Sequence, residues 1–449
     1  MRQFVLPAVF ALLLPFAAAG DDLQSLLEQA CKKHEAPGAL AAVIRDGKIV
    51  GVGAWGVRSL GGDPVEADDL AMIGSCGKSV TRLLIARLVD DGRLTFASTL
   101  GALLPDVAVR AEYKAVTVGD IIGHRAGLPA YTEIGPRITP QLFNRKGSPQ
   151  EQRAAFIAHL LQEQPAAEPG TRFVYSNAGY ALLGHIAERL AGRSYEDLVA
   201  AEVFKPLGMT SARIGLPTEA PGRAALTGHR RGPSGYQPGE RPPALPTLAP
   251  AGLMSCSISD FARLAGALVG VESDPPTGFL KPATAQKIRE LRPGGGKSAG
   301  EGVPFFGGDG YYTAAFALWP SQKLGIVVAT NAGENDAVCA AVLEAVRAKY
   351  APKATPVPVE ESSEAGPPVV PLGILFDARD AGDIQITEVT ADSIAARAGV
   401  KAGDRLLAID GVALSEIPAG RLRERLAGKQ VVLTLERDGV KREVTLTRP

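Results

Sequence analysis

Residues 73–94 read IGSCGKSVTRLLIARLVDDGRL, and this stretch decides how the rest of the chain is interpreted. Apolar residues recur at helical spacing from Val80 to Leu88, which predicts one amphipathic helix from Ser75 to about Asp91. The first turn of that helix carries the pattern S-x-x-K, whose spacing bears on chemistry.

Ser75 and Lys78 form this pattern. Residues three apart lie on one helical face, so the lysine amine can approach the serine hydroxyl. A serine needs a base to become a nucleophile, and lysine serves only when burial and the helix dipole lower its pKa. The Ser75 backbone N–H at the helix start can face a developing oxyanion. Alternatively, Ser75 is a plain N-cap, because S-x-x-K also arises by chance.

A second candidate segment is Tyr175-Ser176-Asn177, which precedes a helical run over 178–190. Taken alone, it fits a helix cap with a packing aromatic side chain. His124, in the turn after an expected helix over 117–123, is interpreted as structural rather than catalytic.

Composition excludes several classes of protein. The 449 residues suggest two or three domains, and 48 basic residues balance 48 acidic ones, so we expect no nucleic-acid partner. No H-E-x-x-H motif or cluster of carboxylates suggests a metal site, and we expect neither a metal nor a cofactor. The cysteines are too widely spaced for a metal motif but could form one disulfide in an oxidising compartment. They are Cys31, Cys76, Cys256 and Cys339.

The N-terminus predicts a signal peptide over residues 1–20. Arg2 is followed by an apolar stretch from Phe4 to Phe16 and by small residues suited to cleavage after Ala19 or Gly20. An uncleaved anchor is the alternative, although the apolar run is short for a spanning helix. Beyond this stretch we expect no membrane-spanning segment.

Residues 21–350 are expected to form one catalytic domain. The expected helices cover residues 22–34, 75–91, 117–123, 150–164, 178–191, 194–204 and 335–349. The expected strands cover residues 40–45, 49–55, 311–319 and 324–330. Strands thus lie near both ends and helices in the middle. This order predicts an α+β fold with one antiparallel sheet built from both ends, flanking helices and an inserted helical domain.

The C-terminal part is expected to be separate. Residues 351–368 are rich in Pro, Glu and Ser and predict a linker, followed by a small β-barrel-like unit over 369–449. Its expected strands cover residues 384–389, 405–409, 431–437 and 443–447, and its expected short helices cover 393–398 and 420–426.

The combination of motifs resembles the serine β-lactamase-like family, which includes class C β-lactamases, D-Ala-D-Ala carboxypeptidases, D-aminopeptidases and esterases. The resemblance spans about residues 22–350. It rests on 73–94 and on the following segments in family order: 116–131, 168–192, 203–213, 250–264 and 324–333.

The resemblance implies a fold and a set of roles. The fold would be of the β-lactamase/transpeptidase type. Ser75 would be acylated by the substrate carbonyl, and Lys78 and Tyr175 would share the proton transfers, with Tyr175 as the base for deacylation. Asn177 would hold the substrate amide and the Lys78 amine.

The third family motif is where the sequence departs from the pattern. The family has Lys or His, one residue, then Gly on the strand lining the site, whereas the best-placed segment here begins with Phe305-Phe306. The Gly307 and Gly308 backbone would still line the substrate, and the Gly308 N–H could complete the oxyanion hole. Lys297, in a Gly-rich loop, is a weaker substitute for the missing base. The departure argues against a good β-lactamase or carboxypeptidase. It leaves open ester or amide substrates that carry no carboxylate.

Residues 369–449 resemble a bacterial PDZ domain through PLGI (371–374), SIAARAGVKAGDRLLAIDG (393–411) and VVLTLERDGVKREVTL (431–446). In such domains the turn of Leu372, Gly373 and Ile374 would offer N–H groups to a peptide carboxylate or a protein C-terminus. The alternative is a domain that only packs against its catalytic neighbour.

We therefore expect a periplasmic or secreted serine hydrolase that acts through a Ser75 acyl-enzyme. Its substrate would be an ester, amide or peptide, cell-wall substrates included, and its PDZ-like domain would bind peptide or regulate activity. The alternative is a catalytically weak or inactive penicillin-binding-like scaffold that binds protein partners.

Overall fold

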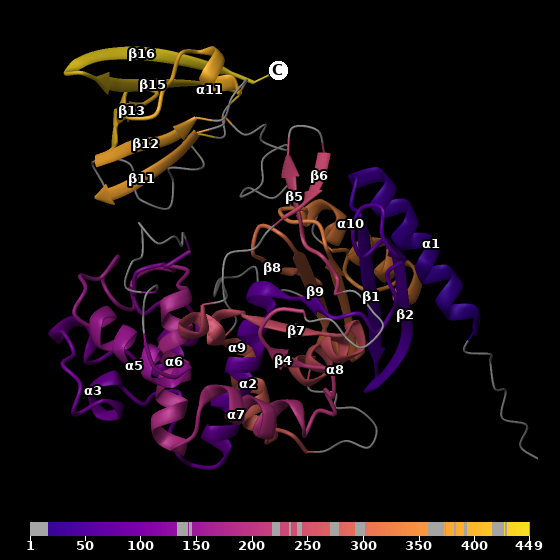
Figure 1. The fold of residues 1–449 in the computed structure, drawn as a ribbon. Helices are drawn as coiled ribbons and strands as arrows, with labels where there is room; N and C mark the ends of the chain where they lie inside the picture. Colours follow the sequence, from indigo (N-terminus) through magenta and orange to yellow (C-terminus); the bar gives the residue numbers. More distant parts are fainter. Residues whose placement is uncertain are drawn as a thin grey trace, which may run out of the picture. The chain divides into compact units, whose positions relative to one another are not determined.

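The computed structural model divides the chain into two compact units. Figure 1 labels the helices and strands of the chain. Unit 1 comprises Met1–Thr95, Ala187–Ala244 and Ala249–Val357, and unit 2 comprises Phe96–Ile186, Leu245–Leu248 and Pro358–Pro449. The described residues are 17–132, 142, 146–217, 225–232, 235–239, 245–269, 278–291, 301–357, 372, 374–380, 383–389, 393–414, 426 and 429–448.

A five-stranded antiparallel sheet forms the centre of unit 1. Its order is β2-β1-β10-β9-β8, so strands from the two ends of the unit lie side by side. The strands are β1 (Gly38–Arg45), β2 (Lys48–Gly56), β8 (Phe305–Gly308), β9 (Thr313–Trp319) and β10 (Leu324–Thr330). The expected sheet built from both ends is therefore confirmed, and β8 lies at its edge.

Helices cover both faces of this sheet. α1 (Ala17–His34) and α10 (Asp336–Tyr350) share one core cluster with alternate strand residues such as Ala315. The neighbouring Phe316 points the other way, toward α8 (Ile258–Val269), because successive side chains of a strand face opposite sides. β1 is buried on both faces for this reason, and its sequence is almost entirely apolar.

The remaining elements of unit 1 surround the predicted nucleophile or lie at the surface. They are β3 (Ala71–Met72), η1 (Gly74–Gly77), α2 (Lys78–Asp90), α7 (Tyr195–Val199), the π-helical turn η4 (Ala200–Phe204), β4 (Arg213–Ile214), β5 (His229–Gly232), β6 (Gly235–Pro238), β7 (Met254–Cys256), α9 (Pro282–Glu290) and η6 (Pro320–Gln322). The 3₁₀ turn η5 (Pro246–Ala251) crosses between the two units in sequence.

The helical part of unit 2 begins its helices where the sequence provides caps. Thr117 and Asp120 form a capping box at the start of α4, and Ser148 and Glu151 form another at α5, where Pro149 is the first residue. The elements are α3 (Leu100–Leu103), η2 (Ala111–Tyr113), α4 (Val118–Ile122), α5 (Pro149–Leu160) and α6 (Asn177–Ala191), which continues into unit 1.

The C-terminal part forms a six-stranded sheet in the order β11-β12-β13-β15-β16, with β14 beside β13. Its elements are β11 (Ile374–Asp380), β12 (Asp383–Val389), α11 (Ile394–Arg397), β13 (Arg405–Ile409), β14 (Val412–Ala413), β15 (Gln430–Arg437) and β16 (Val440–Thr447). Asp404 is fully buried and accepts hydrogen bonds from Arg437 and Arg442. Burial alone would raise the Asp404 pKa, but these bonds outweigh it and the pKa is lowered.

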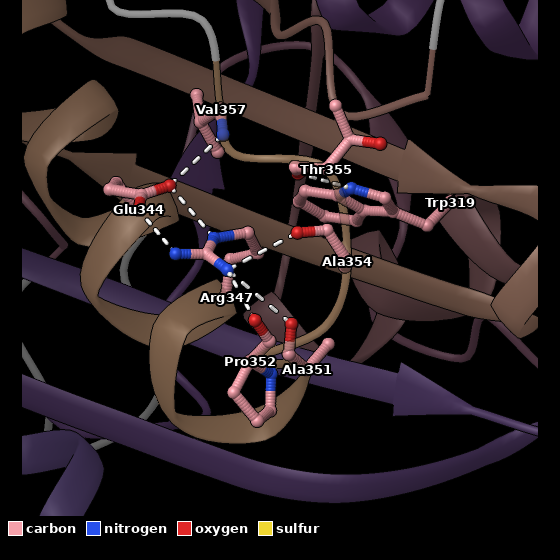
Figure 2. Close-up of polar contacts among 8 residues, drawn as sticks. All are labelled: Trp319, Glu344, Arg347, Ala351, Pro352, Ala354, Thr355 and Val357. Carbon is pink, nitrogen blue, oxygen red and sulfur yellow. Dashed lines mark hydrogen bonds and ion pairs between the residues drawn. The ribbon is translucent and has the colours of Figure 1, made fainter.

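The chain after α10 folds back onto unit 1 as a strap of residues 351–357 (Figure 2). The Arg347 guanidinium donates to the carbonyl oxygens of Ala351, Pro352 and Ala354 at 3.5, 3.4 and 3.3 Å. Its other face pairs with the Glu344 carboxylate at 2.9 Å. One nitrogen of this side chain thus contacts three backbone oxygens of the segment that follows the helix.

Two further bonds fix the far end of the strap. The Glu344 carboxylate accepts from the Val357 N–H at 3.0 Å, and the Trp319 indole donates to the Thr355 oxygen at 2.9 Å (Figure 2). Residues 351–357 therefore belong to unit 1, and the linker predicted over 351–368 begins too early. Pro-rich composition misled the prediction because it does not reveal that Arg347 and Trp319 donate hydrogen bonds to the backbone of this segment.

Smaller differences concern element ends. The helix expected from Ser75 begins at Lys78 and is preceded by the 3₁₀ turn η1, and the strand expected from 311 begins at Thr313. The signal peptide up to residue 16, Lys297 and nearly all of the helix over 420–426 lie outside the described residues. Among the helices that the structure describes, none has the length and apolar character that crossing a bilayer requires.

Candidate active site

Ser75 lies on the 3₁₀ turn η1, directly before α2. Every residue from Ala71 to Ala86 is buried except Ser75, which is partly exposed. The N-cap residues of η1 and α2 are Ile73 and Gly77, and neither makes a side-chain capping bond. Ser75 is therefore not an N-cap here, and it is the one residue from Ala71 to Ala86 that is not buried.

Lys78 is the immediate partner of this hydroxyl. Its Nζ donates to Ser75 Oγ at 3.1 Å and to the Ala251 carbonyl oxygen at 2.7 Å. The side chain is only 1% exposed, and burial lowers the pKa of the amine to about 7. A lysine with this pKa is partly neutral near pH 7 and can accept the serine proton.

The turn that carries Ala251 is held by the same face of α2. Thr81, three residues after Lys78, donates to the Pro250 oxygen at 2.6 Å and contacts the Tyr195 hydroxyl at 2.8 Å. Lys78 and Thr81 thus hold consecutive carbonyls of one turn. The amine is therefore fixed by a backbone acceptor as well as by Ser75.

Glycines let three backbone segments converge on Ser75. A Cβ at Gly307 would lie 2.4 Å from the Ile73 oxygen and 2.7 Å from the Ser75 nitrogen, and one at Gly74 would lie 2.4 Å from the Gly308 nitrogen. A Cβ at Gly252 would lie 2.3 Å from the Gly74 oxygen. Gly74 has a φ of +49° and Gly252 one of +141°, both conformations that favour glycine. Strand β8 thereby places its backbone against the Ser75 amide.

Phe305 stands on β8 where the third motif would carry a base. Its ring stacks on Phe316 of β9, its partner in register, with centroids 5.5 Å apart. The backbone oxygen of Phe305 accepts from Cys76 Sγ at 3.6 Å. Phe306 points to the opposite face and packs against the core beneath α1 and α10. The predicted departure therefore places an aromatic ring beside the nucleophile turn.

The cysteines take no part in this chemistry. All four are buried and free, so the disulfide that the sequence allowed is not formed. Cys76, next to the nucleophile, is fully buried, and burial raises the pKa of its thiol. A buried thiol of raised pKa is not a nucleophile.

In unit 2, Tyr175 lies at the entrance to α6. Its ring stacks on His124 with centroids 4.5 Å apart. His124 is buried, has a φ of +56°, and accepts the Ser176 N–H through Nδ1 at 3.0 Å. Its carbonyl accepts from the Val174 N–H at 2.7 Å. His124 therefore positions the Tyr175 segment, as the structural interpretation of this histidine expected.

Ser176 and Asn177 fasten the same segment to the 124–131 turn. Ser176 Oγ donates to the Pro129 oxygen at 2.6 Å. The Asn177 backbone donates to the Ala130 oxygen at 2.8 Å, and its Nδ2 donates to the Tyr131 oxygen at 2.9 Å. These bonds give the H-x-x-G-L-P turn a function in the fold, which is to hold the segment containing Tyr175.

The structure distributes the predicted residues over two units. Unit 1 brings together Ser75, Lys78, Gly307 and Gly308, and unit 2 carries Tyr175 and Asn177. Sequence reasoning missed the Ala251 carbonyl as a partner of Lys78 and Thr81 as its support. The adjoining Pro250 and Gly252 mark a turn, but nothing in the sequence says which amine it faces.

The predicted peptide-binding turn of the C-terminal part is described in part. Leu372 is buried, and its carbonyl accepts from the Ala395 N–H at 3.0 Å. Ile374 opens β11, an edge strand of the sheet. Gly373 lies outside the described residues.

Comparison with known families agrees with this architecture. The family described as beta-lactamase matches residues 23–348, more than half of the chain, and the PDZ domain family matches residues 385–437. Penicillin-binding protein 4 of Amycolatopsis lactamdurans is 30% identical over 190 residues, which are 42% of this chain and 47% of that protein.

Two further proteins extend the comparison. Unguisins hydrolase from Aspergillus campestris is 27% identical over 272 residues, 58% of this chain and 49% of that protein. This chain therefore spans about half the length of both curated relatives. The solved octameric penicillin-binding protein homologue from Pyrococcus abyssi matches with a TM-score of 0.57 and 18% identity over 95% of each chain. That likeness concerns the fold alone.

Proposed function

The chain belongs to the β-lactamase family and carries a C-terminal PDZ domain, and from this premise we propose that it is an exported serine hydrolase acting through a Ser75 acyl-enzyme. The substrate is an ester, an amide or a peptide. The observation that carries the proposal is the contact of 3.1 Å between Lys78 Nζ and Ser75 Oγ, made by an amine whose burial lowers its pKa to about 7.

In the acylation step, neutral Lys78 takes the proton of Ser75 Oγ as the oxygen bonds to the substrate carbonyl carbon. The bond from that carbon to the leaving group breaks, and the leaving group receives the proton. The N–H groups of Ser75 and Gly308 stabilise the oxyanion. In deacylation, water bonds to the acyl carbon, the carbon–Oγ bond breaks, and a proton returns to Ser75.

For deacylation we assign Tyr175 as the base and Asn177 as the residue that holds the substrate amide. Family membership and the order of the motifs support this assignment. The rigid fastening of their segment to the 124–131 turn suits it, because a proton acceptor must be held in place to act.

Labelling tests the nucleophile directly. The full chain is incubated with a fluorophosphonate, digested and analysed by mass spectrometry. The expected result is one adduct on Ser75, absent in Ser75→Ala and much slower in Lys78→Met. Absence of an adduct on Ser75, under conditions in which a control serine hydrolase is labelled, would contradict the proposal and favour the inactive scaffold. The function of such a scaffold would also survive Ser75→Ala.

We further propose that the PDZ domain binds a peptide or a protein C-terminus at Leu372, Gly373, Ile374 and the edge of β11. Edge strands offer unpaired backbone groups to a peptide. This is tested by selecting peptides with free C-termini from a library for binding to the full chain. The affinity of the selected peptides is then compared with that for Ile374→Asp, which should bind them more weakly. Equal binding by both proteins would refute it.

Export to the periplasm or medium follows from the proposed signal peptide. The first buried side chain described in α1 is Leu23, so cleavage after residue 20 leaves the described core contacts of that helix intact. N-terminal sequencing of protein from the cell envelope or medium tests it, and an intact N-terminus there would contradict cleavage.

A further inference from the structure

The side chain of Phe305 projects from β8 on the face that meets the nucleophile. The Cβ position of Gly307 points at the Ser75 nitrogen, and residues two apart on a strand share a face. Phe305 stacks on Phe316, and Phe316 contacts Phe261 of α8 edge to face, whereas Phe306 enters the core on the other side. Both observations place Phe305 on the Ser75 face.

Phe305 is also within reach of a bound acyl group. Two strand residues span about 7 Å, so the ring begins that far along β8 from the contact of Gly307 with Ser75. The ring is partly exposed, whereas Phe316 and Phe261 behind it are 6% and 1% exposed. A substrate fixed at Ser75 and lying along β8 therefore meets the front of a three-ring aromatic wall.

The strands that form this wall supply no cation for an anionic substrate group. Residues 301–319, which include β8 and β9, contain no Lys, Arg or His. The charged side chain that follows β8 is Asp309, whose carboxylate accepts the Tyr311 and Tyr312 N–H groups at 3.0 and 2.9 Å. A substrate carboxylate at Phe305 would lose part of its water and gain no cationic partner from residues 301–319.

We propose that the site selects esters or amides whose acyl group is neutral and apolar, and that Phe305 is the residue that rejects a carboxylate there. The inference rests on the proposed function of Ser75. It adds to the sequence-based expectation of a substrate without a carboxylate that Phe305 itself lies on the Ser75 face and makes the selection.

The test compares two fluorophosphonates of equal length, one ending in a methyl group and one in a carboxylate. The rate of Ser75 modification is measured on the full chain by mass spectrometry. We expect the neutral reagent to react at least about tenfold faster, the ratio expected when one reagent buries a charge without a partner. Equal rates, or a faster carboxylate reagent, would overturn the inference.

Variants test whether Phe305 causes the preference for the neutral reagent. Phe305→Lys supplies a cation at the wall and should bring the two rates together or invert them, whereas Phe305→Leu should keep the neutral preference. Phe306→Leu is the matched control, because its side chain lies on the opposite face and should leave the ratio unchanged. A ratio that moves with Phe306 and not with Phe305 would overturn the assignment.

Two outcomes separate this inference from its premise. If neither reagent modifies Ser75, the proposed nucleophile fails and the inference falls with it. If the carboxylate reagent reacts well and Arg230→Ala abolishes that reaction, the guanidinium that lies 5.5 Å from the Tyr311 ring is an anion site. The inference would then be wrong although Ser75 is the nucleophile.

Discussion

Ser75 and Tyr175 are held in place by different means. Around Ser75, backbone packs on backbone at Gly74, Gly252 and Gly307, with no room for a methyl group. Around Tyr175, the Ser176 and Asn177 side chains donate to backbone oxygens of the 124–131 turn, and the His124 side chain of that turn accepts the Ser176 N–H. The position of Ser75 therefore depends on close backbone packing, and that of Tyr175 on hydrogen bonds. Substitutions in the two regions should accordingly have different effects.

The largest effect should follow from breaking the packing at the nucleophile. Gly307→Ala forces β8 away from Ser75, because its Cβ would meet the Ile73 oxygen at 2.4 Å. We expect modification of Ser75 by a fluorophosphonate to slow by about 100-fold or more, the usual cost of a lost oxyanion donor.

Gly325→Ala is the control for this variant. It lies on β10 of the same sheet, and its Cβ would meet the Ile44 and Ala265 side chains at 3.1 and 3.3 Å instead of backbone. It should change the rate little. If both alanines slowed the reaction alike, backbone packing would not be what fixes Ser75.

The next largest effect is the pH dependence of the rate at which Ser75 is modified. Below a Lys78 pKa of about 7 the amine is protonated and cannot accept the Ser75 proton. The rate of Ser75 modification should therefore fall about tenfold per pH unit below the pKa and level off above it. Rates measured from about pH 5 to 9 check this, and a flat profile would refute the role of Lys78. Lys78→Arg, charged throughout, should be slow at every pH.

A smaller effect should distinguish the role of the Tyr175 segment from that of the Ser75 turn. His124→Phe keeps a ring against Tyr175 but removes the acceptor of the Ser176 N–H, an unmet buried donor costing about 1–3 kcal/mol. We expect ester turnover to fall about tenfold through a displaced Tyr175, while modification of Ser75 keeps its rate. His159→Phe, at a half-exposed position on α5, is the control. Equal losses of ester turnover and of Ser75 modification would mean that the Tyr175 segment and the Ser75 turn do not act independently.

The smallest effect on activity should come from the strap. Arg347→Met leaves three carbonyls and Glu344 without their cation, which should lower the free energy of unfolding by about 2 kcal/mol. Thermal unfolding of the full chain measures this, with Lys349→Met, a more exposed cation, as control. Indistinguishable midpoints for the two variants would show that the strap is not clamped.

Much of the fold could be predicted because its signals are local. The strands expected over residues 40–45 and 49–55 and the periodic helix after Ser75 each follow from a few neighbouring residues. The pairing of β1 with β10 needed more, namely the order of strands along the whole chain. The strap could not be predicted, because its partners Arg347 and Trp319 become neighbours only after folding.

The site divides in the same way. Sequence order proposed Ser75, Lys78 and Tyr175 through motifs, but it could not show that Lys78 is buried against the Ala251 carbonyl or that His124 holds the Tyr175 segment. Burial and long-range hydrogen bonds are properties of packing, and no spacing of residues encodes them.

The sequence by itself determined the family, the two-ended sheet and the replacement of a basic residue by Phe305, because each is written in residue types and their order. Only the tertiary structure decided that Ser75 is no helix cap, that burial lowers the pKa of Lys78 to about 7, and that Phe305 lies on the face of β8 that meets the nucleophile. The physical reason is that reactivity depends on dehydration and on backbone approach, which segments distant in sequence create only when they pack together.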